Sequence, residues 1–415
     1  MPSHKRNHYV PQWYQRRFLP KELKEKKFCY LNLNPKTIAK GSRYYTEKAI
    51  RFFGTNNCFC QDDLYATRFR NLESTEIEQK FFGKIDNDGL AAVEYFSTFK
   101  HPSVSSVSKK LLNDLLLYMS TQKLRTPKGL TNLAQLIRNN DNNAILYALQ
   151  KFQNLFCALW VECIWCIADA SQSETKFIIS DHPVTVYNKG CFPMSQKCHN
   201  GGDPEIWLSG THTLFPLDLN KILILTNLSW IRNPYGNPLK ERPNSSPFRN
   251  TIFDFHSMQT NRMLTDIEVN EINFIIKKRA HRYIASTNKD WLYPENKIST
   301  EYWNKLGKGY LLMPDPRSVV FSSGLCIGYK DGRAEGFDEY GRKPPCQFAY
   351  QSQRDKEWET FQAFQGEFAK IFGPKRRGLS YEGCRLDHTE DSPEYHAYFI
   401  GLNKKYNSKK KELVY

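Results

Sequence analysis

The sequence lacks the short motifs that identify several large enzyme classes. It has no glycine-rich loop followed by Lys and Ser or Thr, no His-Glu-x-x-His and no Gly-x-Ser-x-Gly, which argues against P-loop NTPases, zincin proteases and α/β-hydrolases. The longest apolar stretch, residues 155–170, is interrupted by Glu162 and is too short to cross a membrane. Residues 1–19 contain no apolar run typical of a signal peptide. We therefore expect a cytoplasmic protein without a membrane partner.

Acidic residues are scarce relative to basic ones. The chain has 43 Asp and Glu against 59 Lys and Arg, which gives a net charge of +16. Such an excess attracts polyanions, although it is also compatible with a role in solubility alone. The 23 Tyr and 27 Phe supply rings on which unpaired bases can stack, although most of these rings must fill the core. The combination predicts nucleic acid as the main partner.

The eleven cysteines lack the spacing of a disulfide scaffold or of a structural zinc site. This pattern indicates a reducing compartment, and we predict no metal ligands among the cysteines. One alternative metal set remains, in which Asp62, Asp63 and Asp181 hold Mg²⁺ for a metal-dependent nuclease.

The periodicities of apolar residues predict an α+β fold with a mixed sheet, several long core helices and a smaller C-terminal α+β region. Residues 1–290 form the expected core domain. Residues 291–415 form an extension whose aromatic helix, with Trp358 and Phe364, predicts docking of nucleic acid or of a protein partner. The expected helices begin at Thr75, with a bend or interruption at 86–89, and span 107–126, 144–170 and 266–284. The expected strands lie at 27–33, at 37–39 as the start of a return strand, at 176–187 with a break at 180–183, and at 215–217 with 222–226. Residues 191–210 form an expected long loop that could act as a lid.

The segment His8-Tyr9-Val10-Pro11-Gln12 is the first candidate site element. His8 is the expected general acid or base because imidazole titrates near neutral pH, and Asp181 could fix its tautomer. Gln12 and Arg16 would bind substrate if the segment is helical. The structural alternatives are that His8 caps a turn and that Asp181 forms an Asx-type turn before Pro183.

Gln122 and Arg125 form the second candidate element. They continue the core-facing stripe of the helix at 107–126, so the buried edge of that helix becomes polar in its last turn, which costs stability unless partners are present. Arg125 could grip a phosphate with both arms of its guanidinium while Gln122 positions the substrate. The alternative is a buried ion pair between Arg125 and Asp181. His182 is also among the predicted substrate-binding residues.

Several of these segments occur together in one order, namely His8-Tyr9-Val10-Pro11-Gln12, Gln122 with Arg125-Thr126-Pro127, Ser180-Asp181-His182-Pro183, Phe215-Pro216-Leu217, and Asn273 before Ala280. Over roughly residues 4–286 the chain resembles a bacterial domain-of-unknown-function family that opens with His-Tyr-Val-Pro-Gln and carries Asn where this chain has His182. The resemblance implies a shared fold, a shared site and a cytoplasmic bacterial protein with a role in anti-phage defence or as a toxic effector. It supplies no activity.

Taken together, the residues predict a nucleic-acid-processing enzyme, an RNA or DNA phosphodiesterase in which His8, Asp181 and Arg125 are catalytic. Two alternatives stay open. The first is a noncatalytic nucleic-acid- or nucleotide-binding module of a larger complex, and the second is an enzyme that acts on a free nucleotide.

Overall fold

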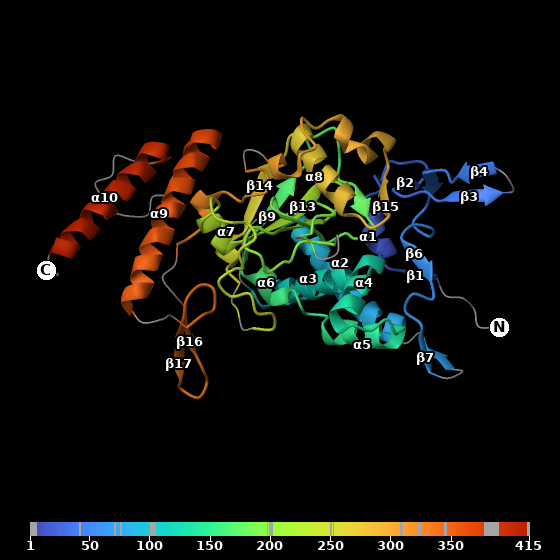
Figure 1. The fold of residues 1–415 in the computed structure, drawn as a ribbon, viewed down its shortest axis with the longest axis horizontal. Helices are drawn as coiled ribbons and strands as arrows, with labels where there is room; N and C mark the ends of the chain where they lie inside the picture. Colours follow the sequence, from blue (N-terminus) through green and yellow to red (C-terminus); the bar gives the residue numbers. More distant parts are fainter. Residues whose placement is uncertain are drawn as a thin grey trace.

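The chain folds into an α+β structure, shown as a ribbon in Figure 1. In that view helices α2–α6 lie below the central strands and α8 lies above them. The computed structural model describes residues 6–40, 43–69, 72–74, 77–99, 105–196, 198, 202–249, 251, 253–307, 310–321, 325–343, 347–376 and 390–412.

The central sheet has five strands in the order β11-β12-β13-β9-β14. β14 runs parallel to β9 and the other neighbours are antiparallel, so the sheet is mixed as predicted. Both faces of β12 and β13 are covered, which explains the apolar runs Leu214–Pro216 and Ile222–Leu225 within them. The strands are β9 (Cys163–Asp169), β11 (Thr185–Tyr187), β12 (His212–Pro216), β13 (Lys221–Asn227) and β14 (Gln259–Met263).

A second, four-stranded sheet has the order β10-β15-β2-β5 and is antiparallel throughout. Its strands are β2 (Phe28–Asn32), β5 (Ile50–Phe53), β10 (Ile179–Ser180) and β15 (Tyr283–Ser286). The strand predicted at 27–33 is confirmed. The predicted region 176–187 does break in the middle, and its halves, β10 and β11, belong to different sheets.

Three small hairpins or strand pairs complete the N-terminal part. The strand at 37–39 does not return along β2 as expected, because it pairs with the strand that follows it instead. The pairs are β3 (Thr37–Lys40) with β4 (Arg43–Thr46), β1 (Arg6–His8) with β6 (Cys60–Asp62), and β7 (Thr67–Phe69) with β8 (Leu72–Ser74).

The helices of the first two thirds of the chain pack around both sheets. They are α1 (Gln12–Arg16), α2 (Gly83–Ser97), α3 (Ser106–Arg125), α4 (Pro127–Ile137), α5 (Asn142–Lys151), α6 (Cys157–Val161), α7 (Leu228–Arg232) and α8 (Asp266–Arg279). The predicted end of the helix at 107–126 is confirmed, because Thr126 is extended before Pro127 and its hydroxyl accepts from the amide of Gly129. α4 therefore begins where α3 stops.

Three helix predictions are wrong in part. Residues 144–170 are not one helix, since the chain leaves α6 and enters β9, a strand so fully buried that its sequence shows no alternation. The helix at 266–284 ends at Arg279, because Ala280 is extended and β15 follows. Residues 86–89 do not interrupt α2, which runs from Gly83 to Ser97. The missing side chain of Gly89 lets this helix lie against Tyr118 of α3. The predicted start at Thr75 lies outside the described residues.

The C-terminal third packs on the edge of the central sheet. A second apolar cluster joins Trp230 and Ile231 of α7 to Phe361, Phe364 and Phe368 of α9, so these rings are core residues. The main cluster also continues into this third of the chain at Leu292, Trp303, Leu306, Leu311 and Leu312. The elements are β16 (Leu325–Gly328), β17 (Ala334–Phe337), α9 (Gln347–Phe372), β18 (Lys375–Arg376), β19 (Glu390–Asp391) and α10 (Pro393–Glu412).

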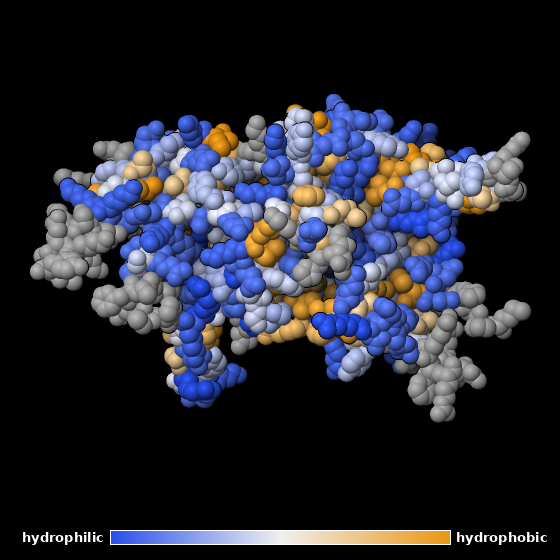
Figure 2. Space-filling view, viewed as in Figure 1, coloured by the Kyte–Doolittle hydropathy of each residue, from blue (hydrophilic) through white to orange (hydrophobic). Residues whose placement is uncertain are grey.

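The C-terminal helices form one end of the molecule. α9 and α10 lie side by side at the end opposite the N-terminal strands, and the β16–β17 hairpin projects from the body. On the face seen in Figure 2, hydrophobic residues form separate patches among predominantly hydrophilic ones. No helix within the described ranges is long and apolar enough to cross a membrane.

Candidate functional site

The N-terminal motif lies at the end of β1 and in α1. The Nε2 atom of His8 is 3.3 Å from the carbonyl oxygen of Asn56, and burial lowers the pKa of this half-buried imidazole although that contact opposes the shift. Gln12 accepts a hydrogen bond of 3.3 Å from the Thr55 hydroxyl. Arg16 is exposed at the end of α1. The strand and the short helix therefore anchor the motif to residues 55–60.

Gln122 and Arg125 meet protein partners inside the core. Gln122 donates to the carbonyl oxygen of Tyr9 at 2.8 Å and accepts from Nε of Arg125 at 2.7 Å. The guanidinium of Arg125 also forms a two-armed ion pair with Asp86, at 3.1 and 2.8 Å. Burial opposes the charge of Arg125, but Asp86 outweighs it, so the pKa of the guanidinium lies above its usual value. The carboxylate partner of Arg125 is therefore Asp86 and not Asp181.

Asp181 holds the turn between α8 and β15. Its carboxylate accepts hydrogen bonds of 2.8, 2.6 and 2.8 Å from the backbone amides of His281, Arg282 and Tyr283. The residue is 1% exposed. Burial raises the pKa of the carboxyl group, and the three amides oppose that effect because they stabilise the anion. Asp181 and His8 share no hydrogen bond or ion pair, and the amides occupy both oxygens of the carboxylate.

His182 belongs to a buried ionic network. Its Nδ1 lies 2.7 Å from the Thr126 hydroxyl and its Nε2 lies 3.1 Å from Asp203. Nε2 also lies 3.2 Å from Nζ of Lys123, an ammonium group that only donates, so this nitrogen faces both a donor and the Asp203 acceptor. Burial and the nearby Lys123 lower the pKa of His182 to about 3, so the ring is neutral.

Two lysines complete this network. Lys123 and Lys128 bind the two oxygens of Asp203 at 2.7 and 2.5 Å. Burial opposes the ionisation of Asp203, but the two ammonium groups outweigh it and hold the carboxyl pKa well below its usual value. Burial lowers the pKa of Lys123, against the opposing effect of Asp203. Asp203 thus offsets one of the two positive charges of the lysines within the protein.

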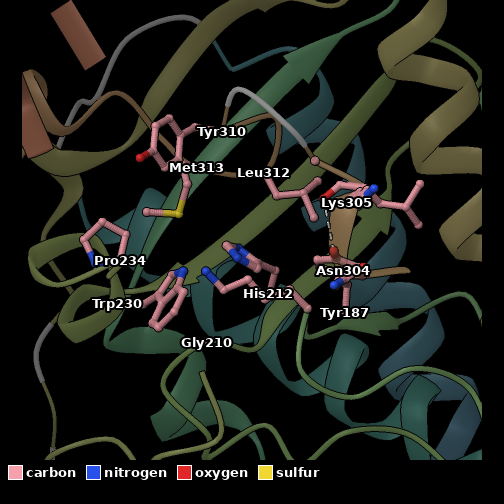
Figure 3. A pocket seen from close by; sticks show the side chains of 13 residues that line it. Tyr187, Gly210, His212, Trp230, Pro234, Asn304, Lys305, Tyr310, Leu312 and Met313 are labelled. Atoms are coloured by element: carbon pink, nitrogen blue, oxygen red, sulfur yellow. Dashed lines mark hydrogen bonds between the residues drawn. The ribbon is translucent and has the colours of Figure 1, made fainter. Parts of the chain in front are cut away.

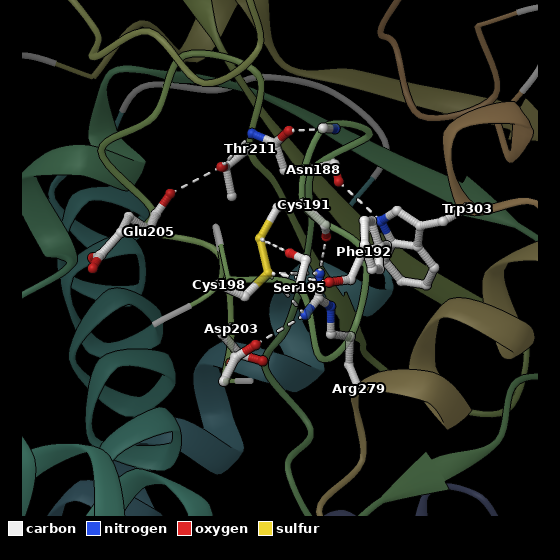
Figure 4. The surroundings of a disulfide bond; sticks show 12 residues. Asn188, Cys191, Phe192, Ser195, Cys198, Asp203, Glu205, Thr211, Arg279 and Trp303 are labelled. Atoms are coloured by element: carbon white, nitrogen blue, oxygen red, sulfur yellow. Dashed lines mark hydrogen bonds between the residues drawn. A yellow bond between two sulfur atoms is a disulfide. The ribbon is translucent and has the colours of Figure 1, made fainter. Parts of the chain in front are cut away.

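The loop that carries Asp203, expected as a possible lid, is pinned at several points, as Figure 4 shows. A disulfide joins Cys191 to Cys198, which the cysteine spacing did not predict. Arg279 donates to the carbonyl oxygens of Cys191 at 2.5 Å and Gly202 at 3.0 Å, and its guanidinium lies 4.8 Å from the ring centre of Trp303. These contacts tie the loop to the end of α8.

The proposed magnesium ligands do not form a group. Asp62 pairs with Arg6 at 3.7 Å on the surface, whereas Asp181 binds backbone amides in the core. Asp63 follows β6 with a positive φ of 54°. Within the described ranges, no three His, Cys, Asp or Glu side chains are placed to hold a metal ion together.

The structure therefore brings the predicted residues together only in part. Gln122, Arg125 and the backbone of the N-terminal motif form one connected cluster, while Asp181 and His182 lie in separate hydrogen-bond networks. In each cluster most polar atoms bind other protein atoms. The sequence located the polar residues of the interior, but their geometry is that of structural contacts.

A different group of residues lines a cavity of about 470 Å³, shown in Figure 3. This volume is within the range of about 300–1,000 Å³ that is common for small-molecule sites. His212 of β12 and Trp230 of α7 lie on one side of the view, and Leu312 and Met313 lie opposite them. Lys189, which follows β11, also lines the cavity, with its ammonium 5.0 Å from the ring centre of Trp230.

The hydrogen bonds of His212 define its tautomer. The Thr226 hydroxyl donates to the carbonyl oxygen of Leu312 at 3.0 Å, so it must accept from Nδ1 of His212, which is also 3.0 Å away. The lone pair is then on Nε2, for which the described part of the chain provides no hydrogen-bond partner. Burial and the charge of Lys189 lower the pKa of His212 to about 3. A neutral imidazole with an available lone pair thus lines the cavity beside a cation.

His212 and Lys189 are not among the site residues predicted from the sequence. The predicted strand begins at Phe215 and the predicted loop ends at Gly210, so His212 lies between two predicted elements. The available signal was a histidine flanked by Thr211 and Thr213 directly before a strongly apolar strand. In a strand, alternate side chains share a face, so a polar residue there must meet either a partner or an opening.

Comparison with known families matches residues 6–155 and 146–290 to DUF4238, described as a protein of unknown function. The match covers well over half of the chain. The chain belongs to the DUF4238 family, and the predicted membership of a family of unknown function is confirmed. No curated protein and no solved structure matched the chain.

Proposed function

We propose that this protein is a nucleic-acid-processing enzyme, an RNA or DNA phosphodiesterase whose reaction centre is the cavity around His212. The observation that carries the proposal is the position of Nε2 of His212, a neutral imidazole that lines the cavity together with the Lys189 ammonium. Among the described residues, this nitrogen has no hydrogen-bond partner. A lone pair beside a cation suits proton removal from a nucleophile next to an anionic ester.

In the proposed reaction Nε2 of His212 takes a proton from water, or from a ribose hydroxyl, as its oxygen attacks phosphorus. The P–O bond to the leaving group then breaks, and solvent or an ammonium group of the cavity protonates the departing oxygen. Lys189 offsets the charge that develops on the nonbridging oxygens. A phosphate bound beside His212 raises the pKa of the imidazole, because an opposite charge favours the protonated form. Substrate binding therefore strengthens the base.

The residues predicted from the sequence take a supporting role in this proposal. Arg125 and Gln122 hold the N-terminal motif against α3, and Asp181 holds the start of β15. Their removal is expected to affect stability, whereas a change at His212 affects turnover.

The test is an incubation of purified protein with labelled single- and double-stranded RNA and DNA in Mg²⁺, Mn²⁺ or EDTA. The decisive variant is His212→Asn, whose amide can still donate to Thr226 but which has no atom in the place of Nε2. We expect this variant to fold normally and to lose at least about 100-fold in cleavage rate, the usual contribution of a general base. Lys189→Gln should lose activity as well.

The matched control is His281→Ala, which removes an exposed imidazole far along the chain and keeps the backbone amide that Asp181 binds. It should cleave like the wild type. If His212→Asn cleaved at the wild-type rate, the assignment of the base would be wrong. Binding of polymer without cleavage under any metal would favour the noncatalytic module, and turnover of mononucleotides alone would favour the free-nucleotide enzyme. Growth arrest on expression, lost in His212→Asn, would support the toxic or defensive role.

A further inference from the structure

Three cavities adjoin one another along the seam between the family region and the C-terminal third. The cavity around His212 shares Trp230 with a neighbour of about 450 Å³ that reaches Lys240 and Lys356. On its other side it shares Lys189 and Asn304 with a cavity of about 620 Å³ that reaches Lys278. The shared wall residues place the three cavities next to one another in a series, with the cavity around His212 in the middle.

The series is lined by lysines that have no acidic partner. Five lysines line it, and within the described ranges none forms an ion pair: Lys189, Lys240, Lys278, Lys305 and Lys356. Elsewhere in the chain several lysines are paired, such as Lys123, Lys128 and Lys277. The acidic residues of the series are fewer, and Glu357 is already bound by Arg232 and Tyr340. The lining therefore carries an excess of positive charge.

Aromatic rings alternate with these lysines. The ammonium groups of Lys189, Lys278 and Lys305 lie about 5 Å above ring centres, at 5.0 Å from Trp230, 5.1 Å from Phe274 and 5.0 Å from Tyr302. Tyr302 is 70% exposed and Phe192, which lines the same cavity as Tyr302, is 55% exposed. Exposed rings next to unpaired cations combine stacking faces for bases with charges for phosphates.

We infer that the three cavities form one groove for single-stranded nucleic acid, with the central phosphodiester at His212 and further nucleotides on both sides. The inference rests on the proposed function for the reaction at His212, and it adds that the substrate is single-stranded. A duplex keeps its bases stacked on one another, so it cannot use the rings, whereas a single strand can. The groove requires the C-terminal third, which supplies Tyr302, Lys305 and Lys356.

The experiment measures binding of labelled oligonucleotides to the full-length His212→Asn protein, which keeps the strand intact. Strands of about three and about twelve nucleotides, as RNA, DNA and duplex, are compared over a range of salt concentrations. The two ends of the groove are tested by Lys240→Gln with Lys356→Gln at one end, and by Lys278→Gln at the other. The matched control is Lys151→Gln, since Lys151 is also exposed and lies 5.3 Å above a ring, that of Tyr147, but outside the groove.

We expect the long single strand to bind at least about tenfold more tightly than the short one and than the duplex. Each groove lysine removed should lower the slope of log affinity against log salt by about 0.7 for the long strand and should leave the short strand nearly unchanged. Lys151→Gln should change neither. The RNA and DNA arms show which sugar the groove prefers.

The groove is refuted if the end variants bind the long strand with wild-type affinity and salt slope, or if duplex binds better than single strand. These outcomes differ from a failure of the proposed reaction. If the wild-type protein binds single strands through these lysines but cleaves no substrate, the groove stands and the proposed reaction is refuted. If the protein cleaves through His212 but the end variants still bind the long strand more tightly than the short one by the wild-type factor, the proposed reaction stands and the groove is refuted.

Discussion

Replacement of Asp181 by Ala separates the two roles that this residue could have. The carboxylate accepts three backbone amides at 2.6–2.8 Å in a site that is 1% exposed, and the substitution leaves those amides without their acceptor. A hydrogen bond to a charged group contributes about 1.5–3 kcal/mol. Because bonds that share one acceptor are not additive, we expect Asp181→Ala to lose about 3–5 kcal/mol of unfolding free energy, less than the sum.

The assay is urea unfolding followed by tryptophan fluorescence and far-UV circular dichroism, with agreement between the two probes as the check for a two-state transition. His281→Ala serves as the control, because it keeps the amide that Asp181 binds, and it should stay within about 0.5 kcal/mol of the wild type. A loss below about 1 kcal/mol in Asp181→Ala would refute the structural role. If cleavage also disappeared in that stable variant, Asp181 would return as a catalytic residue.

Three further predictions concern stability. The pKa of His212 is about 3 in the folded protein and near 6.5 when unfolded, so the unfolded state binds the extra proton between those values and stability falls as the pH falls through that window. His212→Asn should reduce this slope by about 1.4 kcal/mol per pH unit, measured by urea unfolding at several pH values. Gly129→Ala should destabilise by more than about 2 kcal/mol despite the higher helix propensity of Ala, because the added Cβ would lie 2.2 Å from the carbonyl oxygen of Lys123; a stabilised variant in thermal unfolding would contradict this. Reduction of the Cys191–Cys198 disulfide should cost about 2–3 kcal/mol in chemical unfolding, and a Cys191→Ser, Cys198→Ser protein should not respond to reductant.

The sequence predicts those elements whose apolar periodicity and whose start and stop signals lie within the element itself. The end of α3 follows from Pro127, and the strand at Phe28–Asn32 follows from its composition. The end of α8 does not, because it depends on Asp181, which lies about a hundred residues away in sequence and caps the chain beyond Arg279. β9 was missed for another reason: a strand with both faces covered has the same apolar composition as a buried helix.

The candidate site illustrates the same limit. Polarity within an apolar pattern identified Gln122 and Arg125 as core-facing polar residues, and both are buried in the structure. Asp181 was expected to project into a site, and it is buried as well. Whether such a residue faces a ligand or a protein partner depends on groups from other elements. Asp86 on α2 satisfies Arg125, whereas no described residue binds Nε2 of His212. Whether a buried polar atom has a protein partner depends on tertiary geometry, which cannot be predicted from the local pattern of a single sequence.

The seam on which the cavities lie has a consequence for how this protein could diversify. His212 and Lys189 come from the family region, whereas Asn304, Lys305 and Lys356 come from the segment that follows it. The imidazole of the proposed reaction centre and part of the proposed groove lining are thus encoded in separate stretches of the gene, although Lys240 and Lys278 of the lining also belong to the family region. A different last third would alter that part of the lining, and it would also have to replace the apolar contacts of Trp303 and Leu306 and the carbonyl group of Leu312 that accepts from Thr226. Such an exchange would change the lining while His212 and Lys189 stay in the family region.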